Sequence, residues 1–125
     1  MDDKKRVLLI DDEADFTKLM KWNLEKTGKY EVRMENQGQN AIAVAKEFKP
    51  NIILLDIMMP DVDGGEVCFT LENDPATEDI PVVFLTAAIG KGEKGKDGSF
   101  IGNHLFIAKP VDIEQLVKTI DENSR

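Results

Sequence analysis

The chain is poor in the residues that form disulfides and metal clusters. Its 125 residues include one cysteine and one histidine. The lone Cys68 excludes an intramolecular disulfide, and no second cysteine or nearby histidine accompanies it at metal-ligand spacing. We therefore expect Cys68 to be a packing residue in a protein of a reducing compartment.

Long apolar runs and an excess of positive charge are also missing. The N-terminal segment 1–6 is charged and leads into only four apolar residues, too few for a signal-peptide core or a membrane span. The 16 basic and 24 acidic residues give a formal net charge of −8, which repels nucleic-acid phosphates and anionic membranes. We expect a cytoplasmic protein that binds neither nucleic acid nor membrane through this chain.

The length fits a single domain over residues 1–125, with its core at about 4–122 and no output domain. At this size, folding buries roughly two-thirds of the surface of the unfolded chain, so neither a disulfide nor a structural metal is needed for stability.

Short apolar runs alternate with helical patterns along the chain. The runs lie at 7–10, 30–34, 51–56, 81–86 and 105–108, and apolar residues at helical spacing lie within 16–24, 41–48, 65–73 and 113–120. Strands that alternate with helices favour parallel pairing through right-handed crossovers. The pattern predicts an α/β fold of the flavodoxin-like type, a doubly wound (βα)5 unit with a five-stranded parallel sheet.

The fourth helix of that unit is the exception. Five of the nine glycines fall between 90 and 102, where this helix is expected. Each glycine inside a helix costs about 1 kcal/mol relative to alanine, which predicts an atypical, mobile segment.

Polar residues stand at the ends of four of the predicted strands. Asp11 and Asp12 follow the first run, Asp56 ends the third, Thr86 ends the fourth, and Lys109 follows the fifth. Because open α/β sheets hold ligands at the carboxyl ends of their strands, we expect these side chains to meet in one crevice.

Three carboxylates in one crevice repel each other unless a cation compensates, and Mg²⁺ prefers such oxygen ligands. A carboxylate can also attack phosphorus when nearby cations neutralise the transferring oxygens. We interpret Asp56 as this nucleophile, already ionised near neutral pH, with Asp11 and Asp12 binding the ion.

The chain resembles the response-regulator receiver domains of two-component signalling. Four segments carry the resemblance, in the expected order and spacing. They are Val7-Leu8-Leu9-Ile10-Asp11-Asp12-Glu13, residues 54–64 around Asp56, Ile80-Pro81-Val82-Val83-Phe84-Leu85-Thr86-Ala87, and Ala108-Lys109-Pro110.

The resemblance implies that Asp56 accepts a phosphoryl group from a sensor histidine kinase or a histidine phosphotransfer protein. It implies a Mg²⁺ site formed by Asp12, Asp56 and the backbone carbonyl of Met58, with Asp11 acting largely through water. Thr86 and Lys109 would contact the phosphoryl group.

The resemblance also implies a conformational switch. Movement of Thr86 would let Phe106, at the position of the family's switch aromatic, turn inward, and Pro110 is a candidate for a cis peptide bond. Phe106 lacks the hydroxyl of the tyrosine often found there. The output would reach a downstream protein or a covalently linked output domain.

Two alternatives remain. A degenerate receiver would act as a phosphorylation-independent interaction module. A phosphatase with an aspartyl-phosphate intermediate would need a second acid, often two residues after the nucleophile, where this chain has Met58. We therefore expect a regulatory phospho-acceptor that assists its own phosphorylation and dephosphorylation, and not an enzyme.

Overall fold

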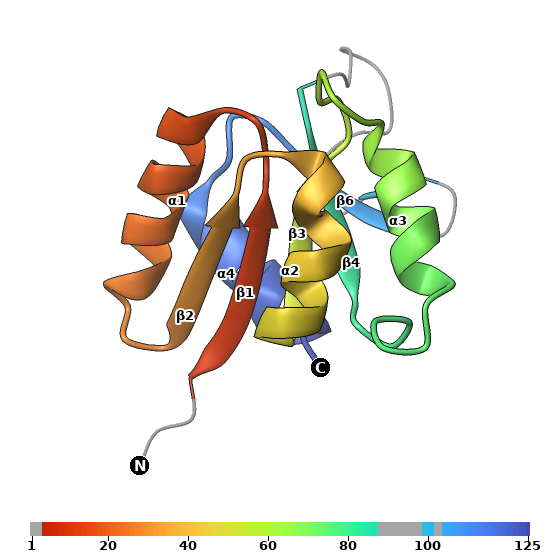
Figure 1. The fold of residues 1–125 in the computed structure, drawn as a ribbon. Coiled ribbons are helices and arrows are strands. Elements are labelled where there is room, and N and C mark those ends of the chain that lie inside the picture. The colour runs from red at the N-terminus through yellow and green to blue at the C-terminus, as the bar shows by residue number, and fades with distance from the viewer. Residues whose placement is uncertain (1–3, 88–98, 102–103) are drawn as a thin grey trace.

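A single sheet with helices on both faces organises the chain (Figure 1). The computed structural model describes residues 4–87, 99–101 and 104–125. The strands are β1 (Lys5–Ile10), β2 (Tyr30–Glu35), β3 (Ile52–Asp56), β4 (Val82–Thr86), β5 (Ser99–Ile101) and β6 (His104–Ala108). The helices are α1 (Ala14–Glu25), η1 (Gly38–Asn40, a 3-10 helix), α2 (Ala41–Phe48), α3 (Gly64–Glu72) and α4 (Ile113–Asn123).

The sheet has the strand order β2-β1-β3-β4-β6-β5. The five strands predicted from the sequence pair in parallel, which confirms the doubly wound α/β fold. The sequence did not predict β5, which pairs antiparallel with β6 at the edge. The glycine-rich segment expected to hold an atypical fourth helix lies outside the described residues, apart from 99–101, and these form β5.

Two apolar layers separate the sheet from its helices. Alternate residues of β1 show the division, because Val7 and Leu9 pack with α1 and α4 while Leu8 and Ile10 pack with α2 and α3. Figure 1 shows the same arrangement, with α1 and α4 on one side of the sheet and α2 and α3 on the other.

All five residues of β3 are buried, because this strand lies between β1 and β4 and is covered on both faces. The strand therefore fixes Asp56, its last residue, at the centre of the carboxyl edge of the sheet.

Local signals set several helix ends. Gly28 follows α1 with a φ of 82°, and Lys49 ends α2 with a φ of 53° just before Pro50. Asp112 caps α4 by accepting a hydrogen bond from the Glu114 amide at 3.0 Å.

The helical spacing of Phe16, Leu19, Met20 and Leu24 predicts the apolar stripe of α1, and this prediction is wrong at one position. Leu19 is 54% exposed, whereas Thr17 is fully buried. Thr17 tolerates burial because its hydroxyl donates to the Ala14 carbonyl at 2.9 Å and accepts from the Asn36 side chain at 3.0 Å.

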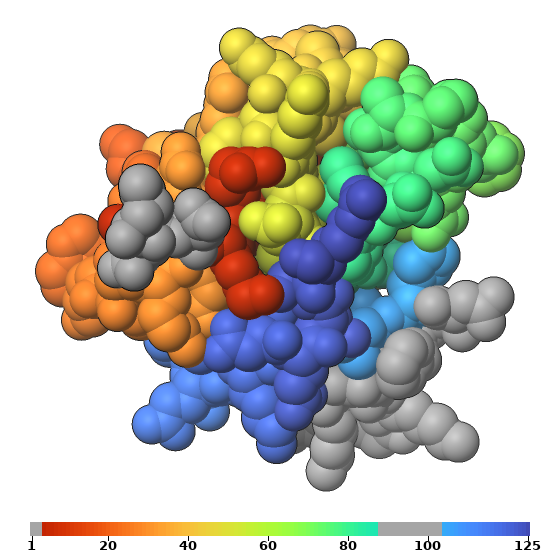
Figure 2. Space-filling model, turned by 90° about the horizontal axis from the view of Figure 1, so that it is seen from below, coloured from red at the N-terminus to blue at the C-terminus, as the bar shows by residue number. Residues whose placement is uncertain are grey.

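At the end of the molecule opposite the carboxyl edge, the C-terminal residues (dark blue) lie near the start of β1 (red) (Figure 2). The Arg125 amide donates to the Asn51 carbonyl at 2.9 Å, and the Asn51 side chain accepts from the Arg6 amide at 2.8 Å. Among the described residues, no helix has the length and apolar character that crossing a bilayer requires.

Candidate functional site

The structure brings the three predicted carboxylates together. Asp11, Asp12 and Asp56 each place one carboxylate oxygen within 4.8 Å of the others. The β1–β3 register explains why these carboxylates lie together. Ile10 pairs with Leu55, so the next residues, Asp11 and Asp56, stand at the same edge of the sheet.

Asp11 is fully buried and held from several sides. Its Oδ1 accepts from the Glu13 amide at 2.9 Å, and the Asn36 side chain donates to its backbone carbonyl at 2.8 Å. Its Oδ2 lies 2.7 Å from Lys109 Nζ in an ion pair, but forms no well-directed hydrogen bond with the described part of the chain.

Lys109 directly follows β6, and its side chain extends to the carboxylate of Asp11. Its Nζ also lies 3.0 Å from Glu13 Oε1 and 4.4 Å from the centroid of the Phe16 ring. Burial opposes the charge of Lys109, but its close contacts with the carboxylates of Asp11 and Glu13 outweigh this and raise its pKa. The ammonium group therefore stays charged at neutral pH.

Asp56 is buried, and its Oδ1 accepts from the Met58 amide at 3.3 Å. Burial, and next the charge of Asp11, raise the pKa of Asp56 to about 7, while Lys109 opposes them. The expectation from the sequence that Asp56 is already ionised near neutral pH therefore holds only in part without a bound ion, because that expectation ignored burial.

The remaining predicted residues lie on β4 and β6 or directly after β6. Thr86 is buried at the end of β4, and its carbonyl accepts from the Lys109 amide at 2.9 Å. Phe106 is fully buried and pairs in register with Phe84 of β4. The Lys109–Pro110 peptide bond is cis, as the resemblance led us to expect.

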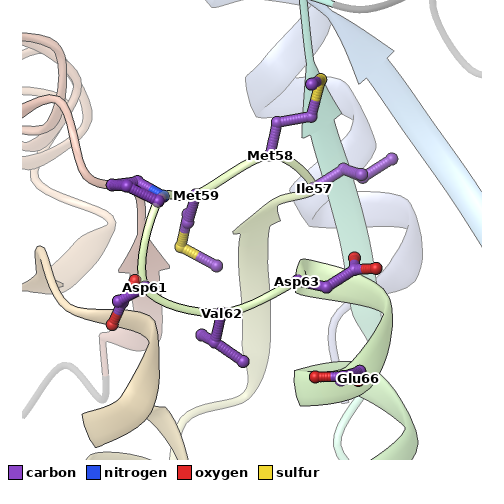
Figure 3. Close-up of a pocket in the computed structure, with 8 residues that line it drawn as sticks. Ile57, Met58, Met59, Asp61, Val62, Asp63 and Glu66 are labelled. Atoms are coloured by element: carbon purple, nitrogen blue, oxygen red, sulfur yellow. The ribbon is translucent and has the colours of Figure 1, made fainter.

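The loop from β3 to α3 forms a separate hollow of about 730 Å³ beside the end of β3 (Figure 3). Met58 points away from the loop and is 64% exposed, whereas the Met59 side chain points into the loop and is buried (Figure 3). Gly38 is needed beneath this loop, because a Cβ atom there would collide with Val62.

The donor set fits a hard divalent cation. Three converging carboxylates, of which those of Asp11 and Asp56 are buried, are the ligands that Mg²⁺ prefers. Lys109 supplies one positive charge against them, which leaves the cluster negative at neutral pH.

Some residues that contribute to the site were not predicted from the sequence. Glu13 forms an ion pair with Lys109, as Asp11 does. Its position directly after Asp11 and Asp12 in the sequence was the signal that could have predicted this role. Gly64 was assigned only to a loop, yet a Cβ there would collide with the Asp56 carbonyl oxygen. No histidine lies at metal-ligand spacing from Cys68 in the sequence, yet the fold brings His104 Nε2 within 3.5 Å of its sulfur.

Comparison with known proteins adds independent findings. The family model described as response regulator receiver domain matches residues 7–121. The structure superposes on the chemotaxis protein CheY4 of Vibrio cholerae with a TM-score of 0.80 at 26% identity, covering 96% of this chain and 98% of that one.

Two curated relatives differ in length. DivK, a polar-differentiation response regulator of Brucella anthropi, is 34% identical over 93% of this chain and 93% of its own length. RpaA, a DNA-binding dual master transcriptional regulator of Synechocystis, is 37% identical over 92% of this chain but only 47% of its own length. The chain thus spans about half of RpaA and nearly all of DivK.

Proposed function

Because the chain belongs to the response regulator receiver domain family, whose members are phospho-acceptor regulatory domains, we propose that Asp56 is its phosphoryl acceptor. One observation carries this proposal. Asp56 ends the buried central strand, and the carboxylates of Asp11 and Asp12 converge on it beside the ammonium group of Lys109.

In the proposed reaction, a carboxylate oxygen of Asp56 attacks the phosphorus of a phosphohistidine. The new O–P bond forms as the N–P bond breaks, and the electron pair of that bond returns to the donor imidazole. The family interacts with histidine kinases or phosphotransfer proteins, so a protein of one of these two kinds is the proposed donor.

Receiver domains generally bind Mg²⁺ at an acidic pocket, where the ion neutralises charge on the transferring oxygens. We assign its ligands here to Asp12, Asp56 and the backbone carbonyl of Met58, with Asp11 acting through water. Lys109, held by Asp11 and Glu13, would move its ammonium group onto the new phosphoryl oxygens.

Phosphorylation adds roughly −1.5 to −2 charges beside Thr86 and Lys109, so both gain a strong acceptor. Thr86 and Phe106 lie on adjacent strands, β4 and β6, and a shift of Thr86 would change the packing around Phe106. The output would be a population shift of the surface near these strands, read by a downstream protein or a linked output domain.

Two alternatives are less well supported. A degenerate receiver has no need to retain all five polar residues, and this chain keeps Asp11, Asp12, Asp56, Thr86 and Lys109. A phosphatase would need a proton donor near the leaving group, and Met58 has no acidic proton to give.

Phosphorylation with a small donor tests the acceptor assignment. Incubation with acetyl phosphate and Mg²⁺ should add one phosphoryl mass to the intact protein, and the addition should be absent in Asp56→Asn and in EDTA. Asp61→Asn, which removes an exposed carboxylate from the adjacent loop, is the matched control and should label like the wild type. Full labelling of Asp56→Asn would refute the assignment.

A further inference from the structure

A second group of metal-binding side chains lies away from the carboxylate cluster. Cys68 and Glu72 are one turn apart on α3, so they project from the same side of the helix. His104 begins β6, the strand that this part of α3 covers. One ligand atom from each of the three residues lies within 4.8 Å of the other two.

The distances are close to those of a tetrahedral zinc site. Cys68 Sγ lies 3.5 Å from His104 Nε2, and zinc bonds of about 2.3 Å to sulfur and 2.0 Å to nitrogen place such atoms about 3.5 Å apart. His104 Nε2 lies 2.7 Å from Glu72 Oε2, a hydrogen bond that would open by roughly 0.6 Å around an ion.

Two of the three side chains are held in place, and the third is free to adjust. Cys68 is 2% exposed, and the His104 ring meets the Phe84 ring edge-on with 5.3 Å between their centroids. The side chain of Glu72 is 45% exposed, so it is able to withdraw slightly and give an ion access from solvent.

We propose that Cys68, Glu72 and His104 bind a thiophilic divalent cation such as Zn²⁺, with a fourth position open to water. A thiolate and a carboxylate neutralise the two charges of the ion, and a neutral imidazole completes the donor set. Thiolate and imidazole select Zn²⁺ or Co²⁺ over Mg²⁺, whereas the carboxylates of the other site are ligands that suit Mg²⁺.

Binding requires the thiol to release its proton to solvent, and the Nε2 of His104 to be unprotonated. In the metal-free protein, burial and then the charge of Glu72 raise the pKa of Cys68 to about 12, so the thiol keeps its proton. A bound ion would link α3 to β6 at His104, two residues before Phe106. Cys68 and Phe106 belong to the same apolar layer.

Cobalt substitution gives a direct test, because Cys68 is the only cysteine of the chain. Any thiolate-to-cobalt charge-transfer absorption in the near ultraviolet must therefore report Cys68. The protein is titrated with Co²⁺ under reducing conditions, with excess Mg²⁺ present to occupy the carboxylate cluster. Zn²⁺ is then added to displace Co²⁺.

We expect the band in the wild type, its absence in Cys68→Ser, and roughly tenfold or greater loss of affinity in His104→Gln and in Glu72→Gln. Glu66→Gln, which removes another exposed carboxylate from α3, is the matched control and should keep the wild-type affinity. Circular dichroism verifies that each variant is folded.

Either of two results would overturn the proposal. One is the lack of a thiolate band at saturating Co²⁺ in the folded wild type. The other is an unchanged affinity in both His104→Gln and Glu72→Gln, which would mean that the thiol acts without its neighbours. Asp56→Asn should retain the band, so this test is independent of the phospho-acceptor assignment.

Discussion

In the metal-free site, Asp56 holds its proton more tightly than an exposed aspartate does. Burial and then Asp11 raise its pKa from 3.8 to about 7. The folded protein therefore binds more protons than the unfolded chain between about pH 4 and pH 7, and Asp56 lowers stability progressively as the pH rises through that window.

Asp56→Asn should consequently stabilise the metal-free protein. The gain in unfolding free energy should be small near pH 4 and reach the order of 2 to 4 kcal/mol at pH 8. Urea unfolding in EDTA at both pH values measures it. Asp79→Asn, at an exposed position with no ion pair among the described residues, is the control, and an equal gain in that variant would contradict the explanation.

Lys109 has two separable effects. It compensates the carboxylates, and we propose that it contacts the phosphoryl group. In Lys109→Gln the cluster loses a positive charge, so Mg²⁺ should bind at least as tightly as in the wild type, while labelling by acetyl phosphate should slow by roughly tenfold or more. Calorimetric titration and time-resolved intact mass measure the two effects, and weaker Mg²⁺ binding would show that Lys109 instead organises the metal ligands.

At the scale of elements, the junction of β3 with α3 depends on Gly64. The backbone approaches so closely here that an added Cβ would meet the Asp56 carbonyl oxygen, and the Gly64 amide donates to the Ile57 carbonyl at 2.8 Å. The junction therefore fixes where Asp56 stands relative to the loop that carries Met58.

Gly64→Ala should destabilise the protein by about 1 to 3 kcal/mol, because the backbone must shift to admit the methyl group. Gly65→Ala is a close control, since its Cβ would meet only the Asp63 side chain at 3.4 Å. That variant should be neutral or slightly stabilising. Thermal unfolding of both variants distinguishes them, and an equal loss would show that helix α3 is simply sensitive to substitution.

The elements were predictable where one strong pattern determines them. The continuous apolar run of β3 and the parallel order of five strands could be inferred from the sequence, because burial on both faces leaves a simple signal. The β5 strand could not, since Ser99–Ile101 is too short to show alternation and gains its strand state from pairing with β6. The burial of Thr17 could not be predicted either, because it depends on the Asn36 side chain, distant in the sequence, which donates to the threonine hydroxyl.

At the scale of the whole molecule, the fold brings together residues that the sequence keeps far apart. The carboxylate cluster was predictable, because its members follow strands whose ends meet at one edge of the sheet. The environment of the cluster was not, since the pKa of Asp56 depends on burial and on Asp11 in three dimensions. The group formed by Cys68, Glu72 and His104 follows no strand-end rule, because it depends on the packing of α3 over β6.

The central claim is that the residues gathered at this edge make Asp56 the phosphoryl acceptor. Reductive trapping tests it most directly, because borohydride converts an aspartyl phosphate to homoserine and so marks the acceptor permanently. After labelling with acetyl phosphate and Mg²⁺, peptide mass mapping should find homoserine at position 56. Homoserine at position 11 or 12, or at no position in a protein that has gained the phosphoryl mass, would contradict the account.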